Sequence, residues 1–314
     1  MVTLKREWSK PSTILYASEL PANEKNFTFA LAQAKESGAN LVVLHVRNEL
    51  TKPPSDSGKS RGPLSRSRGP FDRLVQHAQD LGIRCRAEVR EGIAPDEILS
   101  FLRERKVDRV VMGVHTPGPV GRLLVGSVAE TVLRKADLPV AIVGPYLKDG
   151  TYRNFLTRVV LCPVSSHRSS EVVARFAAEV AAQHGAHLVL QRVIAPQDCE
   201  EELAGCSLDQ MEVDLLEMVP TGLRSKVTVE TMAVLGDPTE ELLYVGRVLK
   251  ADLIVMGAHD ATHFAATSNS GMVYKVLAYA PCPVITLSPV VLGDYGPASE
   301  MVPSDRIHYM AGVV

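Results

Sequence analysis

Short apolar runs alternate with amphipathic stretches along most of the chain. Five runs in the first 147 residues have the length of strands, four of them continuously apolar and one alternating: 14–17, 41–46, 85–90, 109–113 and 139–143. Four stretches between them repeat apolar side chains at helical spacing: 22–37, 71–81, 95–105 and 128–135. We expect the first of these helices to end at Gly38. The pattern therefore predicts alternating strands and helices.

The same pattern occurs twice along the chain. The segment VDRVVMGVH at 107–115 returns as ADLIVMGAH at 251–259. Likewise, ESGANLVVLHV at 36–46 returns as QHGAHLVLQRV at 183–193. The offset stays close to 145 residues, which indicates a duplicated gene.

Apolar strands that alternate with amphipathic helices predict a parallel sheet with helices on both faces. We expect two tandem α/β domains, 1–147 and 148–314, each an open, doubly wound, parallel five-stranded sheet with right-handed crossovers. Ligands of such sheets bind beyond the carboxyl ends of the strands, where the strand order reverses. The segments that begin at Met112 and Met256 both follow a predicted strand and are therefore candidate ligand loops.

Two segments depart from the repeat. Residues 51–70 combine Pro, Ser and Gly with five basic side chains and one acidic side chain, which favours a disordered surface insert. The alternative is a basic arm over an anionic ligand or partner, whose serines would be targets of phosphorylation. Residues 290–314 have no counterpart in the repeat, and we expect them to be irregular or to pair with another chain.

The composition is that of an ordinary globular protein. Of the 314 residues, 46% are hydrophobic and 22% are charged, and the formal net charge is −2. A charge this close to zero and an aromatic content of 5% give no support for binding to nucleic acid or membranes. No apolar run approaches the roughly 20 residues that span a bilayer, and the first residues lack an apolar signal core. We therefore expect a cytoplasmic protein.

The five cysteines are scattered, and none lies in a zinc-ligand pattern. Cys162 and Cys282 sit in apolar runs and are expected to be small buried side chains. Cys199 and Cys206 share an acidic segment, where a redox pair between them is the alternative to free thiols. We predict no metal site from these residues.

The loop that begins at Met112 has residues typical of an anion site. Its sequence, MGVHTPGPVGRLLVGSVAE, leaves a strand at Gly113 and reaches a predicted helix at Gly126 and Ser127. A helix start offers unpaired N–H groups and the positive end of the helix dipole. Gly126 lets the backbone approach an anion, and we expect Ser127 to cap the helix and to donate to a phosphate oxygen. A tight turn without a ligand is the alternative.

This loop resembles the nucleotide-binding loop of the universal stress protein family. That family carries G-x2-G-x9-G-[ST] between its fourth strand and last helix, and Gly113, Thr116, Gly126 and Ser127 stand at those positions here. The segments TILYASEL and VVLCPVSS are also similar to the strand starts of the family. The resemblance covers nearly the whole chain as a tandem pair. It implies a Rossmann-like, adenine nucleotide alpha hydrolase-like fold that binds ATP.

The resemblance also implies which residues of the first half contact ATP. They follow the first, second and fourth strands or begin the last helix: Ala17, Ser18, Glu19, Val46, Met112, Gly113, His115, Thr116, Gly126, Ser127 and Val128. Glu19 stands where ATP-binding members have Asp, and Thr116 replaces the second glycine of the motif. His115 is equally compatible with a structural histidine. Mg²⁺ is expected to accompany ATP, held mainly by phosphate oxygens and waters.

The second half departs from the motif. Ser165 stands at the position of Glu19, and Asp260 puts a negative charge where phosphates would lie. Ser270 and Gly271 invert the Gly-Ser pair. We expect a structural second domain without nucleotide; Asp260 as a metal ligand is the alternative.

No nucleophile with a base, metal-protease motif or Walker lysine is visible in the sequence. The first hypothesis is a stress-response regulator that binds ATP in its N-terminal half. A ligand-free interaction protein and a weak ATPase are the alternatives. By resemblance, 139–143 and 283–287 are expected to pair within the chain as a pseudo-dimer. A homodimer of whole chains is also compatible with the sequence.

Overall fold

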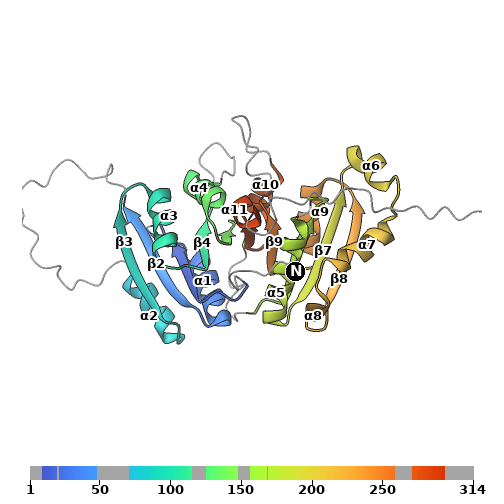
Figure 1. The fold of residues 1–314 in the computed structure, drawn as a ribbon. Helices are drawn as coiled ribbons and strands as arrows, with labels where there is room; N and C mark the ends of the chain where they lie inside the picture. Colours follow the sequence, from blue (N-terminus) through green and yellow to red (C-terminus); the bar gives the residue numbers. More distant parts are fainter. Residues whose placement is uncertain are drawn as a thin grey trace, which may run out of the picture.

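The computed structural model describes residues 9–19, 21–47, 71–114, 125–147, 156–167, 169–258 and 271–293, and its ten strands form one continuous sheet (Figure 1). The first half contributes β1 (Thr13–Ala17), β2 (Asn40–Arg47), β3 (Cys85–Glu91), β4 (Arg109–Gly113) and β5 (Val140–Val143). The second half contributes β6 (Val159–Val164), β7 (His187–Ile194), β8 (Val229–Leu235), β9 (Leu253–Gly257) and β10 (Val284–Leu287). The strand order is β3-β2-β1-β4-β5-β10-β9-β6-β7-β8.

Helices cover both faces of this sheet. Those of the first half are α1 (Glu24–Ser37), α2 (Asp72–Asp80), α3 (Ala94–Glu104) and α4 (Ser127–Lys135). The second half has η2 (Pro196–Asp198), α5 (Ser170–His184), α6 (Cys199–Leu203), α7 (Leu208–Glu217), α8 (Thr221–Arg224), α9 (Pro238–Val248), α10 (Met272–Tyr279) and α11 (Pro289–Gly293). Side chains of α1, α2, α5 and α7 join one apolar cluster, and those of α3, α4, α9 and α10 join the other. The predicted α/β fold is confirmed.

The two halves meet through their last strands. All pairs within each half are parallel, whereas β5 and β10 pair antiparallel with Ala141 opposite Ile285. Thr286 Oγ1 donates to the Val140 carbonyl at 3.1 Å, and Ser288 Oγ donates to the Ala136 carbonyl at 2.6 Å. The expected pairing within the chain is therefore confirmed, and it merges the two predicted sheets into one.

Local signals in the sequence account for the helix ends. Asn23 caps α1, because its Oδ1 accepts the N–H groups of Lys25 and Asn26 at 3.0 and 3.3 Å. Gly38 ends this helix as predicted, in the left-handed conformation that glycine adopts without steric cost (φ 70°). The helix boundaries differ from the predicted ones by one or two residues.

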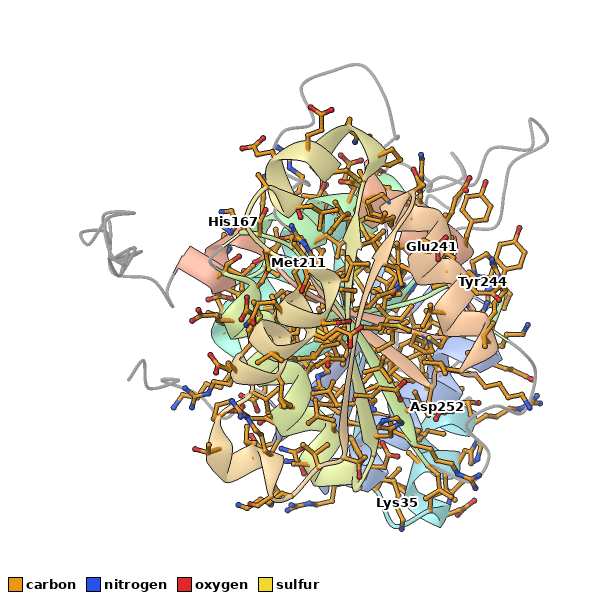
Figure 2. All side chains as sticks on the ribbon, turned by 90° about the vertical axis from the view of Figure 1, so that its right-hand side faces the viewer. Lys35, His167, Met211, Glu241, Tyr244 and Asp252 are labelled. Atoms are coloured by element: carbon orange, nitrogen blue, oxygen red, sulfur yellow. The ribbon has the colours of Figure 1, made fainter. Side chains whose placement is uncertain are left out.

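One aspartate in each half ties the start of a strand to a neighbouring strand. Asp108, before β4, accepts the N–H groups of Ser12 and Thr13 at 2.9 and 3.0 Å. Its repeat partner Asp252, before β9, accepts those of Arg158 and Val159 at 2.8 and 3.0 Å. Figure 2 places Asp252 at the opposite end of the strands from His167, which follows β6. The two aspartates thus lie at one end of the strands, and the candidate site lies at the other end.

The start of the tail and the cysteines can be compared with the sequence predictions. The tail predicted to be irregular begins with a short helix, α11, because Val291 and Leu292 are buried and Ser288 Oγ accepts the Val291 N–H at 3.3 Å. All five cysteines are free thiols, so a bond between Cys199 and Cys206 is not formed. Cys162 and Cys282 are buried, as expected. The insert at 51–70 lies outside the described residues.

Candidate functional site

The strand order of the first half reverses between β1 and β4. In the parallel pairing of these strands Tyr16 lies opposite Val111, which brings Ala17 and Met112 to the same edge of the sheet. Val125 and Ala129, at the start of α4, join the same apolar cluster as Met112. The edge where ligands of such sheets bind is therefore formed by β1, β4 and α4.

Ser18 is fixed firmly at the end of β1. Its N–H donates to the Leu44 carbonyl at 2.8 Å, and its Oγ donates to the Glu19 carbonyl at 2.9 Å. His45 Nδ1 lies 3.0 Å from the Ser18 carbonyl; because a carbonyl only accepts, this nitrogen carries the hydrogen. Ser18 is buried, whereas Glu19 is exposed and Ala17 and Val46 are half-buried.

Two neighbours of this wall were missed by the sequence analysis. His45 supports Ser18 from β2, and its ring lies 5.6 Å from that of Phe71. Asn26, in the first turn of α1, fills the space beside Gly113, where a Cβ would overlap its amide. A side chain at position 113 would therefore have to displace the Asn26 side chain. No motif marks Asn26, because only the packing of α1 on β4 brings it to the loop.

The start of α4 differs from the prediction in one detail. The helix begins at Ser127, and Gly126 is its N-cap with extended backbone (φ −60°, ψ 151°). Ser127 therefore cannot cap the helix, and no side chain makes a capping hydrogen bond there. Ser127 is exposed and Val128 is half-buried. The first N–H groups of a helix have no partner within it, so this start offers donors to an anion.

The second half repeats this helix start. Gly271 is the N-cap of α10, with nearly the same backbone as Gly126 (φ −66°, ψ 148°). The sequence comparison aligned Ser270 and Gly271 with Gly126 and Ser127. In the structure the match is shifted by one residue, so Gly271 corresponds to Gly126, and Met272 replaces Ser127. Ser165 donates its N–H to Ser170 Oγ at 3.1 Å, where the first half has Glu19. His115, Thr116, Asp260 and Ser270 lie outside the described residues.

The described residues of the second half surround a cavity of about 300 Å³ at the ends of β6, β7 and β9. Arg192 and Glu202 form an ion pair in its wall, with Arg192 Nη2 2.6 Å from both carboxylate oxygens. A purely structural half was expected here, so this hollow is a feature that the sequence analysis missed.

Within the parts of the chain that the structure describes, no group of three His, Cys, Asp or Glu side chains could hold a metal. The described helices also include none that is long and apolar enough to cross a membrane.

Comparison with known proteins identifies the family. The profile described as "Universal stress protein family" matches residues 12–144 and 157–288, one match in each half. The chain belongs to the universal stress protein family. A universal stress protein of Methanocaldococcus jannaschii is 38% identical over 119 residues, 36% of this chain and 70% of that relative. A second one from the same organism is 26% identical over 107 residues, 34% of this chain and 60% of its own length.

Solved structures match the tandem arrangement. A universal stress protein from Archaeoglobus fulgidus has a TM-score of 0.59 at 20% identity, and the match covers 88% of this chain and 98% of that one. A protein of unknown function from Pseudomonas aeruginosa has a TM-score of 0.64 at 13% identity, covering 92% and 97%. At these identities the match establishes the fold, a mostly parallel sheet built from two Usp halves.

Proposed function

We propose that this universal stress protein is a stress-response regulator that binds ATP in its N-terminal half. The ligand would lie at the carboxyl edge of β1, β2 and β4. The second half would not take the nucleotide although α10 starts like α4, because Ser165 and Met272 stand there in place of Glu19 and Ser127. The observation that carries the proposal is the start of α4. With Gly126 as the N-cap, no side chain caps the first N–H groups of α4. This helix start lies at the reversal of strand order, where such sheets bind ligands.

The wall formed by β1 and β2 supports this proposal. Ser18 is held by Leu44 and His45, so its position would change little when a ligand binds. Glu19 is exposed at the end of β1, and its carboxylate would contact a ribose or a phosphate-bound Mg²⁺. Ala17 and Val46 would offer apolar surface and backbone groups to adenine.

The phosphates would lie on the opposite side of this edge. Gly126, Ser127 and Val128 would donate backbone N–H groups, and the exposed Ser127 hydroxyl would add a further donor. Met112 and Gly113 would form the exit from β4, followed by His115 and Thr116 of the loop. Mg²⁺ would be held mainly by phosphate oxygens and waters.

Matched variants test the proposal. Gly126→Val places a branched side chain over the proposed phosphates, and extended backbone at this position accepts valine without strain. Gly271→Val makes the same change in α10. Titration calorimetry with ATP and Mg²⁺ should show binding to the wild type and to Gly271→Val, and at least about tenfold weaker binding to Gly126→Val.

Mass spectrometry of small molecules released by heating the purified chain gives an independent answer. An adenine nucleotide should be released from the wild type and lost in Gly126→Val. Absence of heat with ATP, or equal affinities of the two valine variants, would reject the proposal and favour a ligand-free interaction protein. Steady phosphate release that disappears in Gly126→Val would instead indicate a weak ATPase.

A further inference from the structure

Helix α9 carries an apolar surface that no described element covers. Tyr244 and Val248 lie one turn apart on its outer side, and each is 58% exposed. Figure 2 shows Tyr244 pointing from α9 away from the sheet. The rest of the helix is buried in the core through Leu242, Leu243 and Val245. Single exposed apolar side chains are common on soluble proteins, whereas neighbouring ones on one helix face indicate contact with another molecule.

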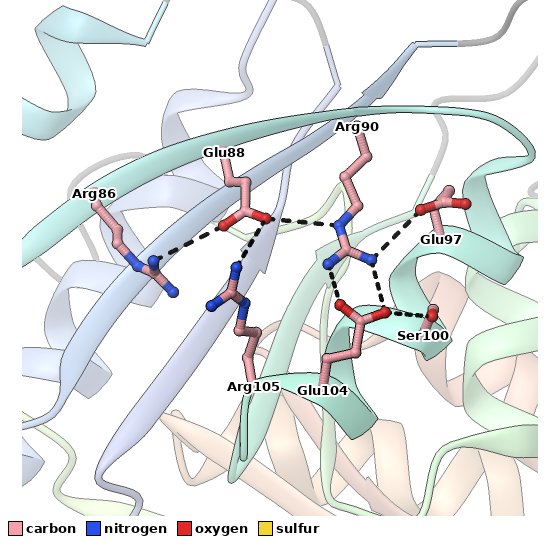
Figure 3. A network of polar contacts seen from close by, with 7 residues as sticks. All are labelled: Arg86, Glu88, Arg90, Glu97, Ser100, Glu104 and Arg105. Carbon is pink, nitrogen blue, oxygen red and sulfur yellow. Dashed lines mark hydrogen bonds and ion pairs between the residues drawn. The ribbon is translucent and has the colours of Figure 1, made fainter.

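The repeat provides an internal comparison for this surface. Helices α3 and α9 are equivalent and have 11 residues each, so Ser100 stands at the position of Tyr244. Glu104 likewise stands at the position of Val248. These polar side chains are paired within their own half, because Ser100 Oγ donates to Glu104 Oε1 at 2.7 Å and Arg90 binds the same carboxylate (Figure 3). A half therefore folds without the exposed apolar pair, and its presence in α9 needs another reason.

Two opposite charges flank the tyrosine along the helix. Glu240 lies about one turn before Tyr244, and Arg247 lies about one turn after it. Because the two charged residues are seven positions apart, close to two full turns, both lie on the same side of the tyrosine. Both are exposed, and neither forms an ion pair with another residue that the structure describes. The outer face of α9 thus has an acidic start, an apolar centre and a basic end.

This order of side chains is complementary to itself. When two copies of a helix pack antiparallel about a two-fold axis, residues at equal distances before and after the axis meet. With the axis at Tyr244, the two tyrosines face each other, and Glu240 of each copy lies opposite Arg247 of the other. Two ion pairs then flank an apolar centre. A parallel pairing would instead bring like charges together, which is unfavourable.

The surroundings of α9 also favour contact with a second copy. At the end of the neighbouring α10, Tyr279 is 45% exposed where the first half has Lys135. The two helices lie side by side here, since a Cβ on Gly246 would lie 3.6 Å from Pro281 Cγ. Tyr279 therefore adds aromatic surface next to α9. The formal net charge of −2 is too small to oppose the association of two chains.

We propose that the outer face of α9 is a homodimer interface, in which two copies of the chain pack this helix antiparallel about a two-fold axis at Tyr244. Tyr244 and Val248 form the apolar centre of the contact. Glu240 of each copy pairs with Arg247 of the other. The interface belongs to the second half and the proposed ATP site to the first, so neither proposal depends on the other.

An exchange of charges tests this interface. Glu240→Arg and Arg247→Glu each bring like charges together at two points of the two-fold contact, so each alone should weaken dimerisation at least about tenfold. The double variant restores both ion pairs with their signs exchanged, and it should dimerise nearly as well as the wild type. Sedimentation equilibrium of the full chain over a series of concentrations measures the dimerisation constants, and thermal unfolding checks that each variant is folded.

Two further variants assign the effect to α9. Asp96→Arg is the matched control, because Asp96 is exposed in α3 at the position that Glu240 has in α9, and it should leave dimerisation unchanged. Tyr244→Ser introduces the residue of the first half and should weaken dimerisation without changing any charge. The mass of a single chain at every concentration, no recovery in the double variant, an undiminished dimer in Tyr244→Ser, or equal weakening by Asp96→Arg would overturn the proposal.

Discussion

His184 Nδ1 lies 3.5 Å from Glu36 Oε2, and the two residues belong to opposite halves of the chain. Glu36 comes from the last turns of α1, and His184 ends α5. The N–H of Thr157 donates to Glu36 Oε1 at 3.2 Å, and Gln33 Nε2 donates to Oε2 at 3.3 Å. This buried polar contact joins the halves on the face of the sheet opposite α4 and α10.

The two groups are not a full ion pair at neutral pH. Burial raises the pKa of Glu36 to about 7, opposed by its bonds to Thr157 and by the charge of Arg109. Burial also lowers the pKa of His184 to about 4, with a further lowering by Arg109. His184 is therefore neutral at pH 7, and Glu36 is about half protonated. Asp252 also faces Glu36 and raises its pKa.

We predict that the variant Glu36→Gln changes the pH dependence of stability. The ordinary pKa of a glutamate is 4.5. Because the pKa of Glu36 is raised, this residue favours the folded state below pH 4.5, and the contribution is lost as pH rises to about 7. The lowered pKa of His184 acts oppositely between about 4 and 6.5. In Glu36→Gln only the effect of His184 remains. The free energy of unfolding of this variant should therefore rise by up to about 3 kcal/mol between pH 4 and pH 6.5.

Urea unfolding measured from pH 4 to pH 8 checks this result. His184→Gln should give the opposite slope, with stability falling between pH 4.5 and 7, and the double variant should lose both slopes. Parallel curves for the wild type and Glu36→Gln would contradict the assignment of these pKa values.

The second prediction concerns the charged network on the edge strand β3 (Figure 3). Arg90 Nη2 lies 2.5 Å from Glu104 Oε2, and its guanidinium also contacts Glu97 and sits 4.8 Å from the centre of the Phe101 ring. Arg90 Nε also lies 3.6 Å from Glu88 Oε1. Arg90→Leu should destabilise the protein by about 1 kcal/mol, because these three carboxylates lose their shared cation. Thermal unfolding at low and high salt measures this, and salt should reduce the loss.

Arg86→Leu is the matched control for this network. Arg86 is more exposed and lies 3.9 Å from Glu88, so its removal should change stability little.

The hydrogen bond from Arg90 lowers the pKa of Glu104 to about 2. The contribution of ionised Glu104 to the free energy of unfolding should therefore be present above pH 4.5 and disappear as pH falls toward 2. Glu104→Gln should no longer show this part of the pH dependence.

The third prediction concerns the junction between the halves. Ser288→Ala removes a buried hydroxyl that donates to the Ala136 carbonyl at 2.6 Å and accepts the Val291 N–H at 3.3 Å. Two buried backbone groups lose a partner, so we expect a loss of about 1–3 kcal/mol in urea unfolding. Ser225→Ala, at an exposed serine of the second half, should stay within about 0.5 kcal/mol of the wild type.

The fourth prediction follows from backbone strain that the repeat preserves. Lys106 and Lys250 occupy equivalent positions after α3 and α9, and both have positive φ, 49° and 52°. A side chain at such a φ is unfavourable, and glycine removes the clash. Lys106→Gly and Lys250→Gly should each stabilise the protein by about 0.5–1 kcal/mol, and the gains should add. Alanine at either site should give no gain in thermal unfolding.

The fifth prediction tests the acid at the end of β1. If Glu19 contacts ATP as the family resemblance implies, Glu19→Asp restores the shorter side chain of ATP-binding members and should raise the affinity severalfold. Glu19→Ala should lower it. Glu24→Asp, at an exposed position in α1, is the control for the same change and should leave calorimetric titrations with ATP unaltered.

The sequence determined the fold because each strand and helix carries its own pattern. Gly38 ended α1 where predicted, and the two copies of the VMG segment both became strands. The family motif likewise marked Gly126, the glycine at which α4 begins. These features depend on neighbours in the chain.

Only the tertiary structure decided which residues meet across the chain. The packing of α1 on β4 brings Asn26 to Gly113, and β2 places His45 behind Ser18. The junction of the halves puts Glu36 next to His184, and the ends of β6, β7 and β9 leave Gln191 unpaired beside a cavity. Local pattern carries no information on such contacts, because they arise between segments far apart in sequence.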